Sequence, residues 1–93
     1  MNFISVLGIF VADLVFFGKE IPSKGQSILG NDYKIGPGGK GSNQAITVAK
    51  LGGNVDFITK IGKDSYGEMA LNIYKETNVK TDSVLIDNNN PTG

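Results

Sequence analysis

The sequence predicts an α/β protein built on a parallel sheet, and three observations support this fold class. Short apolar runs at residues 3–7, 55–61 and 84–86 have the length and composition of strands. Apolar residues recur at helical spacing in residues 42–51 and 65–77, between those runs. Because strands and helices then alternate, right-handed crossovers should bring the three strands into one parallel sheet.

Residues 3–7 open the predicted core, and residues 9–17 continue in apolar residues with a single acid. The first run contains Ile and Val and stops at Gly8, which is typical of a strand that is buried on both faces. Asp13 stands in the second run with apolar neighbours on both sides. Its carboxylate either reaches water at a strand end or serves a function, and the residues alone favour neither interpretation.

Residues 18–35 differ in composition, because glycine, proline and asparagine interrupt the short stretches of this segment. This pattern predicts two extended arms joined by turns instead of a helix. We expect residues 14–17 and 28–35 to pair in a small sheet that stands apart from the main one. Its exposed apolar side chains should be covered by a loop or by a partner.

A glycine-rich run, residues 36–41, leads directly into the first predicted helix. Glycines allow positive φ angles and a close approach of the backbone to a ligand, and the first amides of a helix lack intrahelical partners. Such a junction favours anions and hydroxyl-rich ligands. The spacing Gly36-x-Gly38-x-x-Gly41 matches a dinucleotide fingerprint, but the buried strand that should precede it is missing. The Gly-Lys-Ser/Thr end of a P-loop is missing as well.

Three polar side chains could serve a ligand at this run. Lys40 offers three donors, Asn43 offers donors and an acceptor, and a carboxylate such as that of Asp13 only accepts. Together they match the mixed hydroxyl groups of a sugar. The alternative is that Lys40 is solvated and Asn43 merely caps the helix, and the residues alone leave both interpretations open.

The composition excludes several classes of protein. Nine basic residues balance nine acidic ones at a formal net charge of +0, so no basic face for nucleic acid is expected. The sequence contains no Cys and no His, which excludes disulfides, thiol chemistry and most transition-metal sites. No apolar run is long enough to cross a bilayer and no signal-peptide pattern is present, so we expect a cytoplasmic protein without membrane contact.

The residues from Gly38 to Ala45, followed by Gly52 and Gly62, resemble the N-terminal signature of the ribokinase-type (PfkB) carbohydrate kinases. The Gly-Gly-Lys-Gly-x-Asn-Gln-Ala form of this signature is the one typical of ribokinases, and the resemblance covers the whole chain. Three further pieces fit the same family: Gly8 to Asp13, the lead-in with Pro22, Gly25, Gly30 and Tyr33, and Gly62-Lys63-Asp64-x-x-Gly67.

The resemblance implies a ribokinase-like fold, in which a three-layer α/β domain carries a small β lid. Residues 1–93 would be the N-terminal part of one such kinase domain, with residues 14–35 as the lid excursion within it. The family's catalytic Asp belongs to a Gly-Ala-Gly-Asp motif that this sequence does not contain. We therefore expect the C-terminal catalytic and ATP-binding part to be absent and the chain alone to be inactive.

The same resemblance implies ATP-dependent phosphorylation of a sugar hydroxyl. The cofactors would be ATP and Mg²⁺, and a monovalent cation is a further candidate cofactor. It implies Asp13, Gly39, Lys40, Gly41 and Asn43 as substrate-binding residues, and no catalytic, cofactor-binding or metal-binding residue in this chain. The lids of two subunits would interlock as a homodimer. The expected partners are thus a small sugar, ATP and a second copy of the chain, without nucleic acid or membrane.

One position departs from the family pattern, because ribokinases usually have Asn two residues before the conserved acid and this chain has Val11. A site that lacks one partner for a substrate hydroxyl can differ strongly in selectivity. The sugar class is therefore expected without specifying ribose, and fructose, another ketose or a nucleoside remain open. Two alternatives also stand: a nucleoside kinase of the same superfamily, and a non-enzymatic sugar-binding or oligomerisation module.

Overall fold

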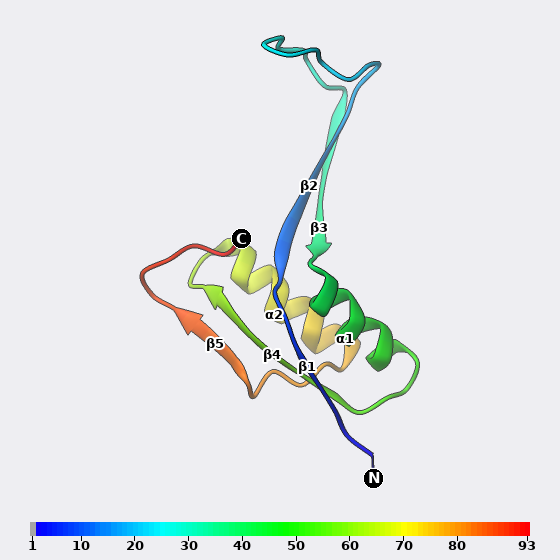
Figure 1. Ribbon diagram of the computed structural model, residues 1–93, viewed down its shortest axis with the longest axis vertical. Coiled ribbons are helices and arrows are strands. Elements are labelled where there is room, and N and C mark those ends of the chain that lie inside the picture. The colour runs from blue at the N-terminus through cyan, green and yellow to red at the C-terminus, as the bar shows by residue number, and fades with distance from the viewer. Residues whose placement is uncertain (1) are drawn as a thin grey trace.

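The computed structural model describes residues 2–93 and shows an α/β unit from which a long two-stranded ribbon projects (Figure 1). The predicted α/β class is confirmed, since three strands and two helices occur at the predicted places. The elements are, in chain order, β1 (Ile4–Leu7), β2 (Val11–Phe17), β3 (Asp32–Gly38), α1 (Lys40–Lys50), β4 (Val55–Gly62), α2 (Ser65–Thr77) and β5 (Val84–Asp87).

The core sheet is parallel, with the strand order β1-β4-β5. Both helices pack on one of its faces, because Phe57 and Ile61 of β4 are buried toward them while Ile58 and Lys60 are exposed on the other face. The ring of Phe57 meets that of Tyr74 in α2 edge to face, with 5.5 Å between the centroids. The buried core consists of Phe10, Ala45, Ala49, Val55, Phe57, Ile61, Ala70, Tyr74 and Val79.

The opposite face of the sheet is open among residues 2–93. Leu7 of β1 pairs with Ile58, and Leu85 of β5 pairs with Lys60, so the register places these four side chains on the same face. Leu7 is 79% exposed. The expectation that β1 is buried on both faces is therefore wrong within residues 2–93. The reason is that no described element covers this side, so two of the three layers of the expected architecture are present here.

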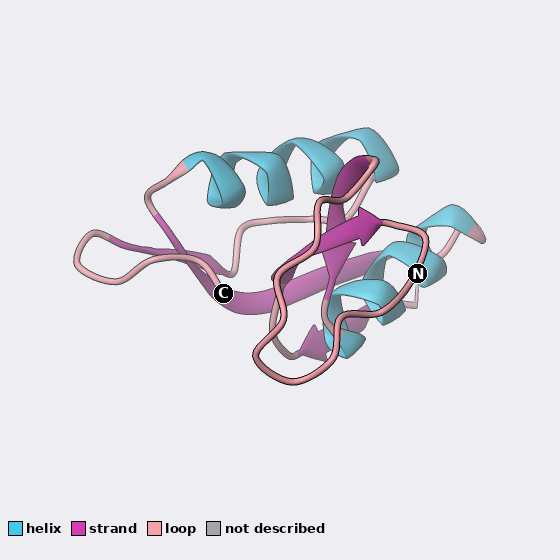
Figure 2. Cartoon of the chain, turned by 90° about the horizontal axis from the view of Figure 1, so that it is seen from above, coloured by secondary structure: helices cyan, strands magenta, loops and turns pink. Residues whose placement is uncertain are grey.

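β2 and β3 pair in antiparallel register from Val11 with Gly38 to Phe17 with Asp32. The ribbon projects away from the sheet and gives the molecule an elongated shape of 53 × 33 × 20 Å. Figure 2 views the molecule from above, with the loop at the tip of the ribbon nearest the viewer and the helices behind it. The ribbon therefore stands apart from the core, as the sequence predicted for this segment.

The bounds of the ribbon differ from the prediction at both ends. Residues 28–31 are not in a strand, and the second arm begins at Asp32 instead. The ribbon also continues through residues 11–13 and 36–38, so half of the glycine-rich run belongs to β3. Gly36, Pro37 and Gly38 can join a strand because β3 lies at the edge of the ribbon, where proline is tolerated.

Candidate functional site

The candidate site lies where β1 ends and α1 begins. The backbones of Gly8 and Gly41 touch there: a Cβ atom added to Gly8 would lie 2.9 Å from the Cα atom of Gly41. A Cβ atom added to Gly41 would lie 2.8 Å from the Cα atom of Gly8. Because neither position has room for a side chain, the two glycines allow the first turn of α1 to lie directly against the carboxyl end of β1.

Gly39 is the N-cap residue of α1 and has φ 95°, a conformation that favours glycine. A Cβ atom at this position would collide with the carbonyl oxygen of Ile9. The amide of Asn43 donates to the carbonyl oxygen of Gly39 at 2.9 Å, but no side chain caps the helix. The alternative that Asn43 serves as the helix cap is therefore not what the structure has, and its exposed side chain is available to a ligand.

Lys40, Gly41 and Asn43 line an open hollow together with the backbone of the β1–β2 connection. The hollow has a volume of 630 Å³. This lies within the range of about 300–1,000 Å³ that is typical of small-ligand sites. The residues that line it are Gly8, Ile9, Gly39, Lys40, Gly41 and Asn43. Four of the five residues predicted to bind substrate are thus brought to one place.

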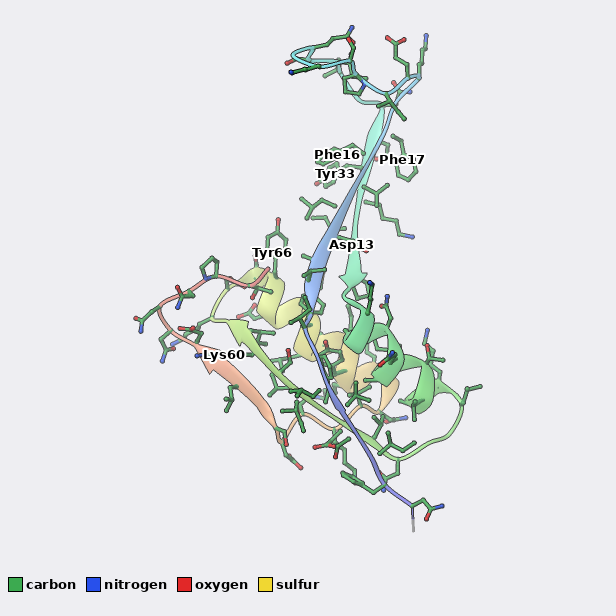
Figure 3. The ribbon with its side chains drawn as sticks, viewed as in Figure 1. Asp13, Phe16, Phe17, Tyr33, Lys60 and Tyr66 are labelled. Carbon is green, nitrogen blue, oxygen red and sulfur yellow. The ribbon has the colours of Figure 1, made fainter. Side chains whose placement is uncertain are left out.

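Asp13 is the fifth predicted residue, and it lies at the base of the ribbon (Figure 3). Its carboxylate abuts Gly38, because a Cβ atom added to Gly38 would lie 2.6 Å from the Cγ atom of Asp13. Asp13 lines a separate, smaller hollow of 230 Å³ with Val15, Lys34, Gly36 and Pro37. It is therefore next to the glycine-rich run, on the ribbon side, but does not line the larger hollow.

The two faces of the ribbon have different chemistry. The register places Asp13 on one face with Lys34, and places Leu14, Phe16, Tyr33 and Ile35 on the other. The rings of Phe16 and Tyr33 stack with 6.2 Å between their centroids, and both are exposed (Figure 3). The Asp13 face thus combines charges with Val15 and Phe17, which are 46% and 48% exposed, whereas the other face is an exposed apolar surface.

Asp64 organises the carboxyl end of β4 and is the N-cap residue of α2, as the sequence allows for Asp64 or Ser65. Its carboxylate accepts from the amide of Gly67 at 2.8 Å, and from the amide and hydroxyl of Thr92 at 2.8 and 2.7 Å. The hydrogen bonds from Thr92 and then from Gly67 lower the pKa of Asp64. Gly93 in turn accepts from the amide of Ala12 at 2.8 Å, so this network joins the core to the base of the ribbon.

Asp87 ends β5 and holds the turn that follows. Its carboxylate accepts from the side chain of Asn90 at 3.0 Å and from the amide of Asn89 at 2.8 Å. Lys60 lies 3.4 Å away as an ion pair. These contacts, with the Asn90 side chain foremost, lower the pKa of Asp87 to about 2. The turn after β5, which contains three consecutive asparagines, is thus organised by one acid.

Residues 2–93 contain neither a metal-binding cluster of side chains nor a helix that could span a membrane. Within these residues, no group of three or more Cys, His, Asp or Glu side chains lies close enough together to hold a metal ion. None of the helices in this range has the length and apolar character needed to cross a bilayer.

A parallel sheet with a glycine-rich helix start at its carboxyl edge defines the class of this protein as an α/β fold. Comparison with known families narrows the class. Residues 1–93 match the family described as "pfkB family carbohydrate kinase" over their whole length, and the chain belongs to that family. The family resemblance noted from the sequence is therefore confirmed.

Individual relatives and structures agree with this assignment. The chain is similar to the ribokinase of Bacillus subtilis (strain 168), at 42% identity over 82 residues, which are 88% of this chain and 28% of the relative. It is also similar to the deoxyribokinase of Salmonella typhi, at 33% identity over 84% of this chain and 26% of the relative. The solved structure of Arabidopsis thaliana ribokinase complexed with ribose and ATP superposes with a TM-score of 0.81 at 32% identity. The superposition covers 97% of this chain and 30% of that one.

These figures confirm the ribokinase-like fold. They also mean that the chain spans less than a third of the length of the curated relatives that it matches.

Proposed function

We propose that this chain supplies the sugar-binding loop and the lid of an ATP-dependent carbohydrate kinase. The observation that carries the proposal is the single hollow lined by Gly39, Lys40, Gly41 and Asn43, with Asp13 beside it across Gly38. The Arabidopsis ribokinase structure is a complex with ribose and ATP, which supports the same class of ligands. Residues 14–35 would serve as the lid. They form the outer part of the ribbon, including the loop at its tip.

Each residue has a proposed role that follows from its chemistry. Asp13 accepts from sugar hydroxyls, Lys40 donates to them, and Asn43 can do both. Gly39 and Gly41 let the backbone approach the ligand closely, since neither has room for a side chain. A site that contains both donors and acceptors discriminates among sugars, because a sugar that does not match them leaves some of the hydrogen-bonding groups unpaired.

The sugar itself is proposed only as a class. Val11 pairs with Gly38 in the ribbon and is half-buried beside the proposed site. The side chain of Val11 forms no hydrogen bond. A substrate without a hydroxyl group at the position that faces Val11 therefore gives up no hydrogen bond there. We therefore propose a pentose, deoxypentose or ketohexose kinase without strict selection for ribose.

The apolar face of the ribbon is the proposed contact with a second copy. Leu14, Phe16, Tyr33 and Ile35 form this face, and all four are exposed in the single chain. Exposed apolar patches of this kind mark interaction surfaces. A homodimer through this face would leave the opposite face, with Asp13, free to meet the sugar.

ATP and Mg²⁺ are proposed to bind elsewhere in the longer protein of which this chain would form part. Transfer of the terminal phosphoryl group to a hydroxyl depends mainly on positioning and on electrostatic stabilisation. This chain would contribute the positioning of the sugar. The base that takes the hydroxyl proton would come from outside residues 1–93.

The test is a substrate panel on the longer protein. Ribose, 2-deoxyribose, fructose and a nucleoside are each incubated with ATP and Mg²⁺, and both ADP release and the phosphorylated product are measured. We expect product with at least one sugar and none with the 93-residue chain alone. Product only with the nucleoside favours the nucleoside kinase, and sugar binding without ADP release favours a non-enzymatic module.

A further inference from the structure

Tyr74 in α2 has a buried hydroxyl whose position the apolar pattern of the helix does not explain. Its side chain is fully buried, and its hydroxyl oxygen lies 2.7 Å from that of Ser42 in the first turn of α1. Ser42 is fully buried as well. A buried hydroxyl costs free energy unless it is paired, so these two residues depend on one another.

The ring of Tyr74 also contacts the other segment of the proposed site. It meets Phe10 edge to face, with 6.3 Å between the ring centroids, and Phe10 is almost completely buried. Phe10 follows Ile9, whose carbonyl oxygen limits the space at Gly39. Tyr74 therefore contacts both the β1–β2 connection and the start of α1, the two segments that line the larger hollow.

We propose that Tyr74 is a positioning residue for the sugar site, which sets residues 39–43 against residues 8–13 through its hydrogen bond with Ser42 and its contact with Phe10. The predicted effect of Tyr74 on catalysis rests on the proposed function. Ser42 stands between Gly41 and Asn43, two residues of the proposed site, so a shift of Ser42 moves both. Displacements of about 1 Å at a substrate site lower activity roughly 100-fold in unfavourable cases.

The protonation state of Tyr74 is compatible with this role. Burial raises the pKa of its hydroxyl, while the hydrogen bond with Ser42 has the smaller, opposite effect. The hydroxyl therefore stays protonated at neutral pH and the hydrogen bond persists. The link between α2 and α1 does not depend on the pH at which the protein works.

The decisive variant is Tyr74→Phe in the longer protein, because it removes the hydroxyl and keeps the ring. Its matched control is Ile61→Val, which alters a buried residue of the same core in neither site segment. Amide hydrogen exchange is measured in residues 8–13 and 36–44 of both variants. We expect Tyr74→Phe to accelerate exchange in these segments about 10-fold relative to Ile61→Val. Equal exchange in both variants overturns the proposal.

Kinetics connect the inference to the proposed function. With Tyr74→Phe we expect the KM for the sugar to rise roughly 5- to 10-fold, while kcat and the KM for ATP stay within about twofold. A residue with only a structural role would lower the amount of active protein without changing the KM for one substrate. An unchanged KM for the sugar in an active variant therefore also contradicts the positioning role.

A second variant keeps the inference testable if Tyr74→Phe folds poorly. Ser42→Ala removes the other hydroxyl, and the double variant Ser42→Ala/Tyr74→Phe leaves no buried hydroxyl unpaired. Because both single changes break the same hydrogen bond, we expect the double variant to accelerate loop exchange no more than either single variant. Additive effects contradict the proposal. If the unmodified protein phosphorylates no sugar, the proposed function fails, whereas the exchange comparison still decides the role of Tyr74.

Discussion

Phenylalanines in the two halves of this molecule have opposite surroundings: Phe57 in the sheet is fully buried, whereas Phe16 in the ribbon is 69% exposed. The core half is held by side-chain packing around Phe57 and Tyr74. The ribbon is held mainly by the backbone pairing of β2 with β3 and by its connection to the core at Gly93 and Ala12. The difference indicates that the core determines where the candidate site residues lie, while the ribbon has the exposed surfaces that we propose as contacts for ligands and partners.

The largest effect expected from this comparison is on stability. Phe57→Ala should lower the free energy of unfolding by about 3–5 kcal/mol, because it leaves a cavity in the core. Phe16→Ala should lower it by less than about 1 kcal/mol, because the exposed ring loses little buried area. Urea unfolding of the longer protein at a fixed concentration measures both. Equal losses would show that the ribbon is packed as tightly as the core and would break the comparison.

The second effect concerns the junction of the two halves at Gly39. Gly39→Val should weaken sugar binding roughly 100-fold or more, because the side chain both strains a positive φ and collides with the carbonyl oxygen of Ile9. Gly52→Val is the matched control, since Gly52 also has a positive φ but no atom within 4 Å of an added Cβ. Isothermal titration with the preferred sugar measures both. If both variants lost sugar affinity to a similar degree, backbone strain alone would explain the effect.

The two halves also differ in how far they could be predicted from the sequence. The strands and helices of the core were predictable because their apolar residues recur at the spacing of each element. The pairing of residues 36–38 with residues 11–13 was not, because glycine and proline are typical of turns and only tertiary pairing places them in β3. Lys40, Gly41 and Asn43 could be proposed as site residues from the sequence because they stand together in one motif.

Contacts between distant residues were beyond the sequence pattern. Ser42 and Tyr74 are 32 positions apart, and each looked like an ordinary helical residue. The contact of Asp64 with Thr92 spans 28 positions and depends on how the segment after β5 returns to the core. Local spacing predicts elements and motifs, but it carries no information on which side chains meet across the fold.

The third effect tests the ribbon side of the site. Val11→Asn should increase the preference for ribose over 2-deoxyribose by about 10-fold, because an added amide can pair with a hydroxyl that valine leaves unpaired. Phe17→Asn is the control, since Phe17 lies on the same face of the same strand, pairs with Asp32 at the far end of the ribbon and lines neither hollow at the site. The ratio of kcat/KM for the two sugars measures the change. An unchanged ratio would mean that Val11 does not face the sugar.

The smallest effect is the response of the core half to acid. The folded pKa of Asp87 is about 2, below its ordinary 3.8, and the pKa of Asp64 is lowered as well. A carboxyl group whose pKa is lower in the folded protein than in the unfolded protein stabilises the fold at pH values above its unfolded pKa. This stabilisation is lost as the pH falls through the folded pKa. Stability should therefore be independent of these two groups near neutral pH and decline below about pH 4, where unfolded carboxyls begin to bind protons.

Two variants near Asp87 sharpen the acid prediction. Asn90→Ala removes the largest cause of the lowered pKa of Asp87, whereas Lys60→Ala removes the smallest. Urea unfolding between pH 2 and pH 5, an interval chosen to span about two units around the ordinary carboxyl pKa, should show a shallower decline in Asn90→Ala than in Lys60→Ala. The reverse order would mean that the ion pair, and not the asparagine turn, keeps Asp87 ionised. Because both acids lie at the carboxyl edge of the core sheet, acid should loosen the support of the site before it separates β2 from β3.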